Sequence, residues 1–595
     1  MVSCGAPGAG GVNRAWAPEF GGFPPSVAPD PSSYQLLDQC PSGLIAQSAP
    51  PPGNAPFLTS GSWVFSAPSG TRITRLETWR FGGRLRTNSG DPDGRDGDQG
   101  DTWETFARDE NASVIGGVFG ETCQTVQNDP ARPGCSFGTD TGVSATSRAV
   151  YPVNVGRIAY SVSCEDLGGC PRYFDNGTDR FSIAWIKLFG TRVTVTDPSA
   201  PTFRPSGSLL AEGWRRPSDV VVYDASDNVG IRAARLELAG RTEVDARACD
   251  FRRTVPCSSV QGGRLGVPAG TPDGEHAARL IGEDAAGNET VVPRTIKLDG
   301  TPPVAVLERA SGRTIVISVS DAASGVANAT LEVRDAGNQP YRTLPATIAN
   351  GRLTARLDRG RASKIDMKVT VDDVAGNQTS GNPARLSVTS ARIGRRNARV
   401  RSARVRVPCG RRATLRGRLT LSAGQAFGGQ SVALTAAPRK RGGRAAFVGS
   451  ATTDGRGRFS IALPAGPSRN LRFVFPGAPG VLGIARGVSA RVPASSSIRA
   501  SRTRLSGAGR VRFSGTLRRS GQRIPGRGLV LVLQGREGGK WRTFADTRTD
   551  RQGRWRASYR FSGRRGSYPI RARIRKQANF PFELGYSGAL TVRVG

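Results

Sequence analysis

Runs in which apolar and polar residues alternate occur along the whole chain, and they predict β-strands. At 180–187 and again at 570–575, apolar residues occupy every second position. Because successive side chains of a strand point to opposite faces of a sheet, this period indicates strands with one buried face. Turns separate these runs, in keeping with the 77 Gly and 40 Pro that the chain contains. We therefore expect an all-β protein of many short strands rather than long helices.

Two sequence patterns occur twice and indicate repeated modules. Asp-x-x-Gly-Asn is found at 284–288 and, 89 residues later, at 373–377. Thr-Asp-x-x-Gly-Arg-aromatic is found at 453–459 and, 96 residues later, at 549–555. A repeat of this length is the size of a small β-sandwich, so residues 200–595 are predicted to form four sandwiches in series.

The predicted fold class is therefore all-β, with tandem β-sandwiches: an N-terminal jelly-roll-like domain and four Ig-like modules. The expected parts are an N-terminal segment without fixed structure (1–30), a disulfide-bonded jelly-roll-like domain (31–195), two Ig-like modules (196–298 and 299–390), a basic linker and strand (391–408) and two further modules (409–493 and 497–595).

Three segments resemble known families. Modules 196–298 and 299–390 each open with a proline-containing turn and near their end carry Asp-x-x-Gly-Asn; they resemble the bacterial Ig-like repeats of exported surface proteins. Modules 409–493 and 497–595 share an x-Gly-x-Leu strand at 416–419 and 514–517, and resemble transthyretin-like, carboxypeptidase-regulatory sandwiches, which serve as spacers. Segment 59–80 resembles the opening strands of carbohydrate-binding jelly rolls. These resemblances imply a bacterial surface protein of the adhesion type.

The nine cysteines favour export and disulfide formation. Zinc is the rival interpretation, but the chain has no Cys-x-x-Cys pair and His276 is its only histidine. Close spacing in a loop-rich β protein suits small disulfide loops. Cys409 is left over and is expected to be a small buried apolar residue. The expected disulfide pairs are Cys123–Cys135, Cys164–Cys170 and Cys249–Cys257, with Cys4–Cys40 as a fourth.

The positive charge is concentrated in the last third of the chain. Residues 391–595 carry 45 basic and 5 acidic residues, whereas residues 1–200 carry 15 and 20. Strict alternation places the apolar residues of three strands in the core and the arginines outside, in rows suited to phosphate or carboxylate. The partner that these rows predict is an anionic envelope polymer or polysaccharide. The candidate residues are Arg404, Arg406, Arg510, Arg512, Arg571, Arg573 and Arg575.

Two acidic segments are candidate cation sites. A Gly-rich loop can fold several carboxylates around calcium, and one loop supplies Asp91, Asp93, Asp96, Asp98 and Asp101. The alternative interpretation is a solvated acidic loop. A second possible site is the turn with Asp224, Asp227 and Asn228, joined by Asp284, but turn capping alone explains these residues and is the preferred interpretation.

No set of catalytic residues emerges from the sequence. Residues 134–138 match the nucleophile-elbow pattern, but their central residue is an expected disulfide cysteine and no helix follows. Glu77 and Glu104 are candidate glycosidase carboxylates, yet sequence alone does not bring them together. We therefore expect a non-enzymatic protein. A secreted glycan-active enzyme and a purely structural stalk remain alternatives.

We expect this protein to lie outside a bacterial cell, with the N-terminal domain binding a ligand such as carbohydrate and the basic modules binding anionic envelope polymers. Sequence-specific nucleic-acid binding is not expected, because the aromatic residues are not grouped into a stacking platform. No run of 18 apolar residues predicts a membrane helix. The first residues show no signal-peptide pattern, and a leader removed earlier is one explanation.

Overall fold

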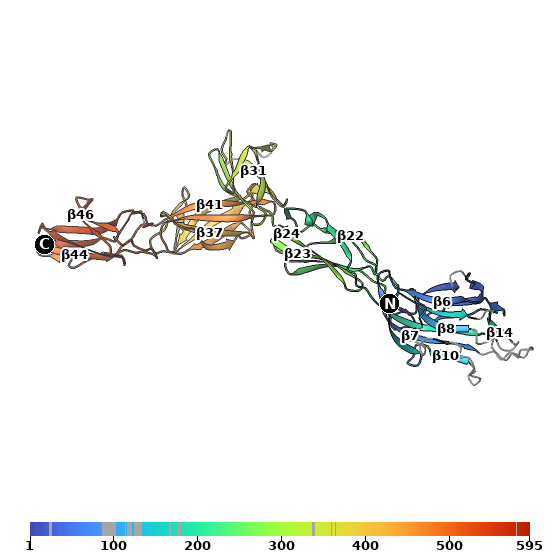
Figure 1. Cartoon of the computed structure of the whole chain (residues 1–595). Coiled ribbons are helices and arrows are strands. Elements are labelled where there is room, and N and C mark those ends of the chain that lie inside the picture. The colour runs from blue at the N-terminus through green and yellow to red at the C-terminus, as the bar shows by residue number, and fades with distance from the viewer. Residues whose placement is uncertain are drawn as a thin grey trace, which may run out of the picture. The chain divides into compact units, whose positions relative to one another are not determined.

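The computed structural model describes residues 1–22, 27–50, 52–85, 103–113, 115, 122–123, 134–165, 168–175, 180–335, 339–358, 360–362, 365–578 and 580–595. The chain divides into two compact units, Met1–Leu298 and Asp299–Gly595. Tandem β-sandwiches make up both units (Figure 1). The named helical elements of the described residues are two 3-10 helices, η1 (Pro31–Ser33) and η3 (Ser208–Leu210). None of the described helices is long and apolar enough to cross a membrane.

The N-terminal domain has two antiparallel sheets, drawn in blue and cyan in Figure 1. The first contains β3 (Tyr34–Asp38), β4 (Leu44–Ser48), β16 (Ala184–Thr196), β7 (Arg72–Leu85) and β10 (Gly134–Gly138), with β1 (Val2–Cys4) and β11 (Arg148–Val155). The second contains β2 (Ala17–Gly22), β6 (Thr59–Ser66), β12 (Arg157–Cys164), β8 (Trp103–Asp109) and β9 (Thr122–Cys123). Two ribbons are formed by β5 (Asn54–Ala55) with β13 (Cys170–Pro171) and by β14 (Tyr173–Asp175) with β15 (Arg180–Ser182).

The prediction that residues 1–30 lack fixed structure is wrong for the described part of that segment. Strand β1 pairs with β16, and β2 pairs with β6. Trp16 is buried, its ring lies 5.7 Å from that of Phe65, and its Nε1 donates to Thr191 Oγ1 at 2.7 Å. The Gly- and Pro-rich composition suggested a loose tail, but burial of one large ring stabilises an ordered one.

Three of the expected disulfides are present: Cys4–Cys40, Cys164–Cys170 and Cys249–Cys257. The side chains of Cys123 and Cys135 lie outside the described residues. Cys409 has no disulfide; it is half-buried, with its Sγ 3.7 Å from Ser520 Oγ.

The first Ig-like module (197–298) packs a three-stranded sheet against a five-stranded one. The smaller sheet contains β17 (Thr202–Ser206), β19 (Val221–Ser226) and β22 (Val260–Leu265). The larger contains β18 (Trp214–Arg215), β24 (Glu289–Leu298), β23 (Gly274–Asp284), β20 (Ile231–Leu238) and β21 (Arg241–Ala246). Apolar side chains at every second position, including Val221, Tyr223 and Leu236, form its own core.

The second module begins at Asp299. Its strands are β25 (Val304–Ser311), β26 (Thr314–Ser320), β30 (Arg352–Arg356) and β29 (Ala346–Ala349) in one layer, and β28 (Arg342–Thr343), β27 (Val326–Arg334), β31 (Asp366–Asp373) and β32 (Gln378–Pro383) in the other. Its core contains Leu482, which belongs to a strand of the next module.

The third module starts earlier in the chain than expected. Residues 391–408 were predicted as a basic linker and strand, but they supply the end of β33 (Arg385–Ile393), β34 (Arg396–Arg399) and β35 (Arg404–Arg406). One sheet contains β33, β34, β36 (Ala413–Thr420) and β39 (Arg458–Leu463). The other contains β35, β41 (Val481–Arg491), β40 (Arg469–Ala478), β37 (Ser431–Pro438) and β38 (Ala446–Thr452). The many arginines of residues 391–408 are typical of a solvated linker, but here they belong to strands whose outer face is charged.

The fourth module is a sandwich of a three-stranded and a six-stranded sheet. The smaller contains β42 (Arg499–Ala500), β44 (Gly509–Thr516) and β47 (Arg554–Phe561). The larger contains β43 (Arg504–Leu505), β50 (Leu590–Val594), β48 (Gly566–Ile574), β45 (Val530–Glu537) and β46 (Lys540–Arg548), with β49 (Gly585–Tyr586). One continuous cluster of buried apolar residues runs through the third and fourth modules.

Within each of these two modules, the x-Gly-x-Leu strand pairs with the strand that carries the aromatic residue of the Thr-Asp-x-x-Gly-Arg-aromatic pattern. Gly417 lies opposite Phe459, and Gly515 opposite Trp555. A Cβ on Gly515 would lie 2.6 Å from the Trp555 ring and 2.1 Å from the Ser497 carbonyl oxygen. Each glycine therefore leaves the space that the partner ring occupies.

Candidate functional site

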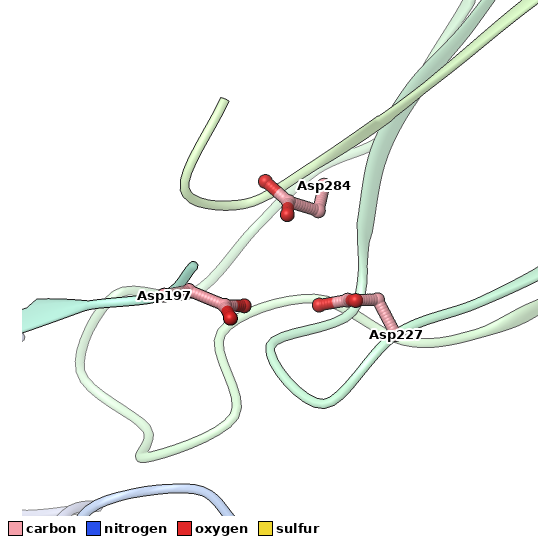
Figure 2. Close-up of side chains that lie close together, drawn as sticks. All are labelled: Asp197, Asp227 and Asp284. Atoms are coloured by element: carbon pink, nitrogen blue, oxygen red, sulfur yellow. The ribbon is translucent and has the colours of Figure 1, made fainter. Parts of the chain in front are cut away.

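Three aspartates from three separate turns meet at the start of the first Ig-like module. Asp197 follows β16, Asp227 follows β19, and Asp284 ends β23. One carboxylate oxygen of each lies within 4.8 Å of the others, and Figure 2 shows the three carboxylates facing a common centre. Asp197 and Asp284 are buried and Asp227 is half-buried. We refer to these three residues as the Asp197 cluster.

The second module repeats this arrangement with Asp299, Asp321 and Asp373, whose ligand oxygens also lie within 4.8 Å of one another. Asp299 follows β24, Asp321 follows β26, and Asp373 ends β31. The equivalent strand ends of two modules thus place three carboxylates together.

The Asp-x-x-Gly-Asn pattern builds one corner of each cluster. Asp284 Oδ1 accepts hydrogen bonds from the backbone N–H groups of 286, 287 and 288, at 2.7, 2.6 and 2.9 Å. Asn288 Nδ2 donates to Asp284 Oδ2 at 2.8 Å and to the Asp197 carbonyl oxygen at 3.1 Å. In the second module Asn377 Nδ2 likewise bonds Asp373 and the Asp299 carbonyl oxygen.

The backbone of this turn is left-handed at its glycine, with φ of 96° at Gly287 and 90° at Gly376. The asparagines of the pattern, Asn288 and Asn377, are not among the residues with positive φ. Their side chains tie the turn to the opening segment of the module, through contacts between residues 91 positions apart in the first module and 78 in the second.

Two buried oxygens at the Asp197 cluster have no hydrogen-bond partner in the described structure: Oδ2 of Asp197 itself and Oδ1 of Asn228, which follows Asp227 in the chain. Asp197 is 6% exposed. Burial raises the pKa of Asp227 most, and the nearby carboxylates of Asp197 and Asp284 raise it further. Unpaired buried oxygens and mutually repelling charges are both costly, and a cation would relieve both. A set of carboxylate and amide oxygens without nitrogen or sulfur suits calcium or magnesium.

The second cluster, Asp299, Asp321 and Asp373, differs in the hydrogen bonds that its carboxylates accept. Asp299 Oδ1 accepts from the Thr301 N–H and Oδ2 from the Ser324 N–H, both at 3.0 Å. Asp321 Oδ1 accepts from the N–H groups of 323 and 325. Because the aspartates of the second cluster have these hydrogen-bond partners, the Asp197 cluster is the better candidate for a cation site.

The sequence indicated part of this site. The predicted site contained Asp227, Asn228 and Asp284. It also contained Asp224, which lies outside the cluster and whose Oδ1 accepts a hydrogen bond from the Gly262 N–H. The prediction missed Asp197, although the proline-containing turn that opens each module was recognised and begins with this aspartate. The calcium candidates Asp91, Asp93, Asp96, Asp98 and Asp101 lie outside the described residues.

Arginines cover the outer face of the smaller sheet in the fourth module. Val511, Phe513 and Trp555 point into the core, so the residues between them point outward. Arg510 lies opposite Arg560 across the strand pair. These strands contain no Asp or Glu. The exposed arginines of this face are Arg499, Arg510, Arg512, Arg554, Arg556 and Arg560.

The equivalent sheet of the third module has a similar face. Leu415, Phe459 and Ile461 are buried, and the intervening positions are exposed. Its strands β33, β34, β36 and β39 also lack acidic residues. The exposed arginines here are Arg385, Arg392, Arg399, Arg416, Arg418 and Arg458. We call these two surfaces the arginine faces.

The remaining candidate arginines differ from one another in exposure. Arg404 and Arg406 of β35 are exposed on either side of buried Val405. Arg571 is half-buried, with its guanidinium carbon 4.0 Å from the Trp541 ring centre and 3.9 Å from that of Tyr586. Its Nε and one terminal nitrogen donate to Gln534 Oε1 at 3.1 and 3.0 Å.

Arg573 of the same strand, β48, is half-buried, and Arg575, which follows the end of β48, is exposed. The alternation of buried and outward positions was predicted correctly for this strand. The arginine faces nevertheless offer more open guanidinium groups than this row does.

Few acidic residues are available to balance these charges. Glu583 pairs with Arg439 and Arg491, while Asp454 accepts hydrogen bonds from the N–H groups of its own turn. Most guanidinium groups of the last two modules therefore face solvent without a carboxylate from their own segment.

The two glycosidase candidates are engaged in ion pairs with different arginines. Glu77 is buried in β7 and accepts from Arg148 Nε at 2.7 Å and from Arg192 at 3.0 Å. Burial alone would raise the pKa of Glu77, but these arginines lower it overall. Glu104 belongs to β8 of the other sheet and pairs with Arg108 at 2.9 Å. These contacts hold both carboxylates as structural ion pairs.

No family model matches the chain, and no curated protein matches it. Among solved structures, it is similar to a tetra-tandem repeat in the extending region of a large adhesion protein, with 14% identity over 67% of this chain and 100% of that one and a TM-score of 0.19. A Ca²⁺-stabilised adhesin that helps an Antarctic bacterium to bind ice shows 15% identity over 66% and 98%, with a TM-score of 0.17.

The four N-terminal Ig domains of Dscam1 isoform 8.4 show 11% identity over 66% of this chain and 98% of theirs, with a TM-score of 0.17. At such TM-scores these likenesses carry no argument about function, so the proposals below rest on the geometry of this chain.

Proposed function

We propose that this protein is a non-enzymatic, extracellular protein of the adhesion type that attaches through its third and fourth modules to an anionic envelope polymer. The observation that carries the proposal is the pair of arginine faces on equivalent sheets. Disulfides formed in the N-terminal domain and the first module support a location outside the reducing cytoplasm.

The arginine faces suit a repeating anion. Outward residues two apart on one strand are about 7 Å apart, and neighbouring strands are about 4.8 Å apart. Each face is thus a grid of guanidinium groups, which bind carboxylates or phosphates through two parallel hydrogen bonds. A flexible polyanion that crosses such a grid releases its bound counterions, and this release drives association.

The other modules have different roles in this proposal. The N-terminal domain presents a ligand-binding surface, with carbohydrate as the proposed class. The first and second Ig-like modules act as spacers, and the Asp197 cluster holds a divalent cation that stabilises the first of them. A glycan array probed with the full chain, with and without calcium, tests the ligand class.

The test of attachment is binding of the full chain to immobilised polygalacturonate and polyphosphate over a series of NaCl concentrations. We expect binding that falls steeply with salt, and none to a neutral polysaccharide. A triple variant with Arg510, Arg512 and Arg560 changed to Ser should lower the slope of log K against log salt by about 2 to 3.

The matched control changes Arg204, Arg264 and Arg294 to Ser, which removes three exposed arginines from the first module. We expect this control to retain the full slope. No binding at low salt, or an equal loss in both variants, contradicts attachment through the arginine faces.

A further inference from the structure

The fourth module has a pocket of about 240 Å³ on one side of its sandwich. Strand β46 ends the larger sheet and β47 ends the smaller one, and the lining of the pocket comes from the β45–β46 hairpin, from β47 and the loop that follows it, and from β48. Tyr559 occupies an inward position of β47, between the inward-facing Ala557 and Phe561, yet it is 37% exposed. The core of the sandwich is therefore open to solvent here.

Four aromatic rings form the wall of this pocket. Phe544 lies 4.7 Å from Tyr559 between ring centres, Tyr559 lies 5.0 Å from Phe561, and Phe561 lies 5.6 Å from Tyr568. The planes of Tyr559 and Phe561 meet at 90°. The pocket thus offers one confined apolar surface rather than a row of parallel ring faces.

The rim of the same pocket is positively charged. Arg536, Arg542 and Arg564 line it, and all three are exposed. Among the described lining residues, Glu537 is the one carboxylate. Arg536 Nε donates to the Gly539 carbonyl oxygen at 3.3 Å, and the Arg564 carbonyl oxygen accepts from Tyr568 Oη at 3.0 Å, which connects the rim to the wall. We name the four rings and three rim arginines the edge pocket.

The chemistry of the edge pocket selects a ring that carries an anion. The C–H face of a pyranose packs against aromatic rings, while a carboxylate or sulfate on the sugar accepts hydrogen bonds from guanidinium groups. A neutral sugar would leave the rim charges uncompensated, and polyphosphate would leave the aromatic wall in water. Single-stranded nucleic acid favours successive stacking platforms, which edge-to-face rings do not supply.

We propose that the edge pocket binds one acidic sugar unit of an anionic polysaccharide. This inference rests on the proposed function, because the arginine faces hold the polymer and the edge pocket distinguishes a polysaccharide from other polyanions. The pocket is lined in part by Tyr559 and Phe561 of β47, and β47 also contributes to the arginine face of the same module. A chain lying on that face can therefore reach the pocket around the edge strand.

The test compares Tyr559→Ala with Tyr559→Phe in the full chain, by calorimetric titration with a galacturonate hexamer and with polyphosphate of matched charge. The Ala variant should lose about fivefold or more in affinity for the hexamer, as is typical when a central aromatic contact is truncated. It should bind polyphosphate as the unaltered protein does. The Phe variant keeps the ring and should retain hexamer binding.

Arg542→Ser supplies a second variant on the rim, with Arg556→Ser on the arginine face as its matched control. We expect the rim variant to reduce the preference for the hexamer over polyphosphate, and the control to weaken both ligands equally. Unfolding transitions that match those of the unaltered protein show that each variant is folded.

Equal affinity of Tyr559→Ala and the unaltered protein for the hexamer overturns the edge-pocket proposal, while leaving attachment through the arginine faces intact. A thymidine oligonucleotide is tested as a competitor of the hexamer. If Tyr559→Ala weakens binding of the oligonucleotide as much as binding of the hexamer, the pocket belongs to nucleic acid and the edge-pocket proposal is overturned. Failure of the unaltered protein to bind either polyanion refutes the proposed function itself.

Discussion

Replacing Asp227 by Asn should change the stability of the first Ig-like module in opposite directions with and without calcium. Asn keeps an oxygen that can accept from the Val229 N–H, as Asp227 Oδ1 does at 2.9 Å. It removes one of three negative charges that lie within 4.8 Å of one another. Without a cation, burial and the neighbouring carboxylates raise the pKa of Asp227, so its ionised form opposes folding. The neutral variant should then be the more stable protein.

The sign follows from linkage. A carboxyl group whose pKa is raised in the folded state stabilises the fold fully below its unfolded pKa of about 3.8, and this stabilisation is lost as pH rises through the folded value. Above the folded pKa of Asp227 the cation-free cluster is therefore in its less stable charge state. A bound divalent cation reverses this by compensating the negative charge.

The size of the calcium effect can be estimated from mass action. Extracellular calcium modules have dissociation constants of about 0.1 to 1 mM. With 10 mM calcium, binding to the folded state alone stabilises it by about 1.4 to 2.7 kcal/mol. Hydrogen exchange of backbone amides at 284–288 in the full chain should then slow by about 10- to 100-fold, and Asp227→Asn should lose most of this protection.

Asp224→Asn is the matched control, because Asp224 is exposed, belongs to the same module and lies outside the Asp197 cluster. It should retain calcium protection. Equal protection of the unaltered protein and Asp227→Asn would refute the assignment of a cation to this cluster. Greater stability of the unaltered protein without calcium would refute the argument from charge repulsion.

Three further predictions concern stability. Gly515→Ala places a Cβ 2.6 Å from the Trp555 ring and should destabilise the fourth module by about 1 to 3 kcal/mol, whereas Gly507→Ala, with open space around it, should not; denaturant unfolding measures both. Asn288→Ala removes side-chain hydrogen bonds to three acceptors and should cost about 2 to 3 kcal/mol in the first module by the same assay. Hydrogen bonds from neighbouring arginines lower the pKa of Asp250 to about 2, so these contacts should persist above pH about 4 and be lost as pH falls towards 2, as hydrogen exchange at 248–253 would show.

The strands and their outward faces followed from local patterns. Arg510 and Arg512 alternate with Val511 and Phe513, and a period of two assigns each residue to a face without any knowledge of the neighbouring strand. The tandem all-β architecture could be inferred in the same way, because each repeated pattern marks one sandwich. The alternation does not show whether an outward residue is free: Arg571 lies on the outer face of its strand, yet it contacts Trp541, Tyr586 and Gln534.

Contacts between distant segments were beyond local patterns. Asp197 joins Asp284 across 87 residues, and nothing in the sequence around either one specifies the other. Trp16 was assigned to a loose tail because its neighbours are Gly, Pro and Ala, while the packing partners that order it come from other strands. The edge pocket was missed because it depends on which strands end each sheet, and this is a property of topology.

Strand β41 links two modules through backbone hydrogen bonds. It pairs with β40 of its own module and, in parallel, with β25 and β32 of the preceding one. When the protein is stretched between its ends, these parallel ladders must shear before either sandwich can lengthen. We therefore expect optical-tweezer traces in which the second and third modules yield together in one large step, so that a cell tethered by this chain would stay attached up to a higher load than separate beads would bear.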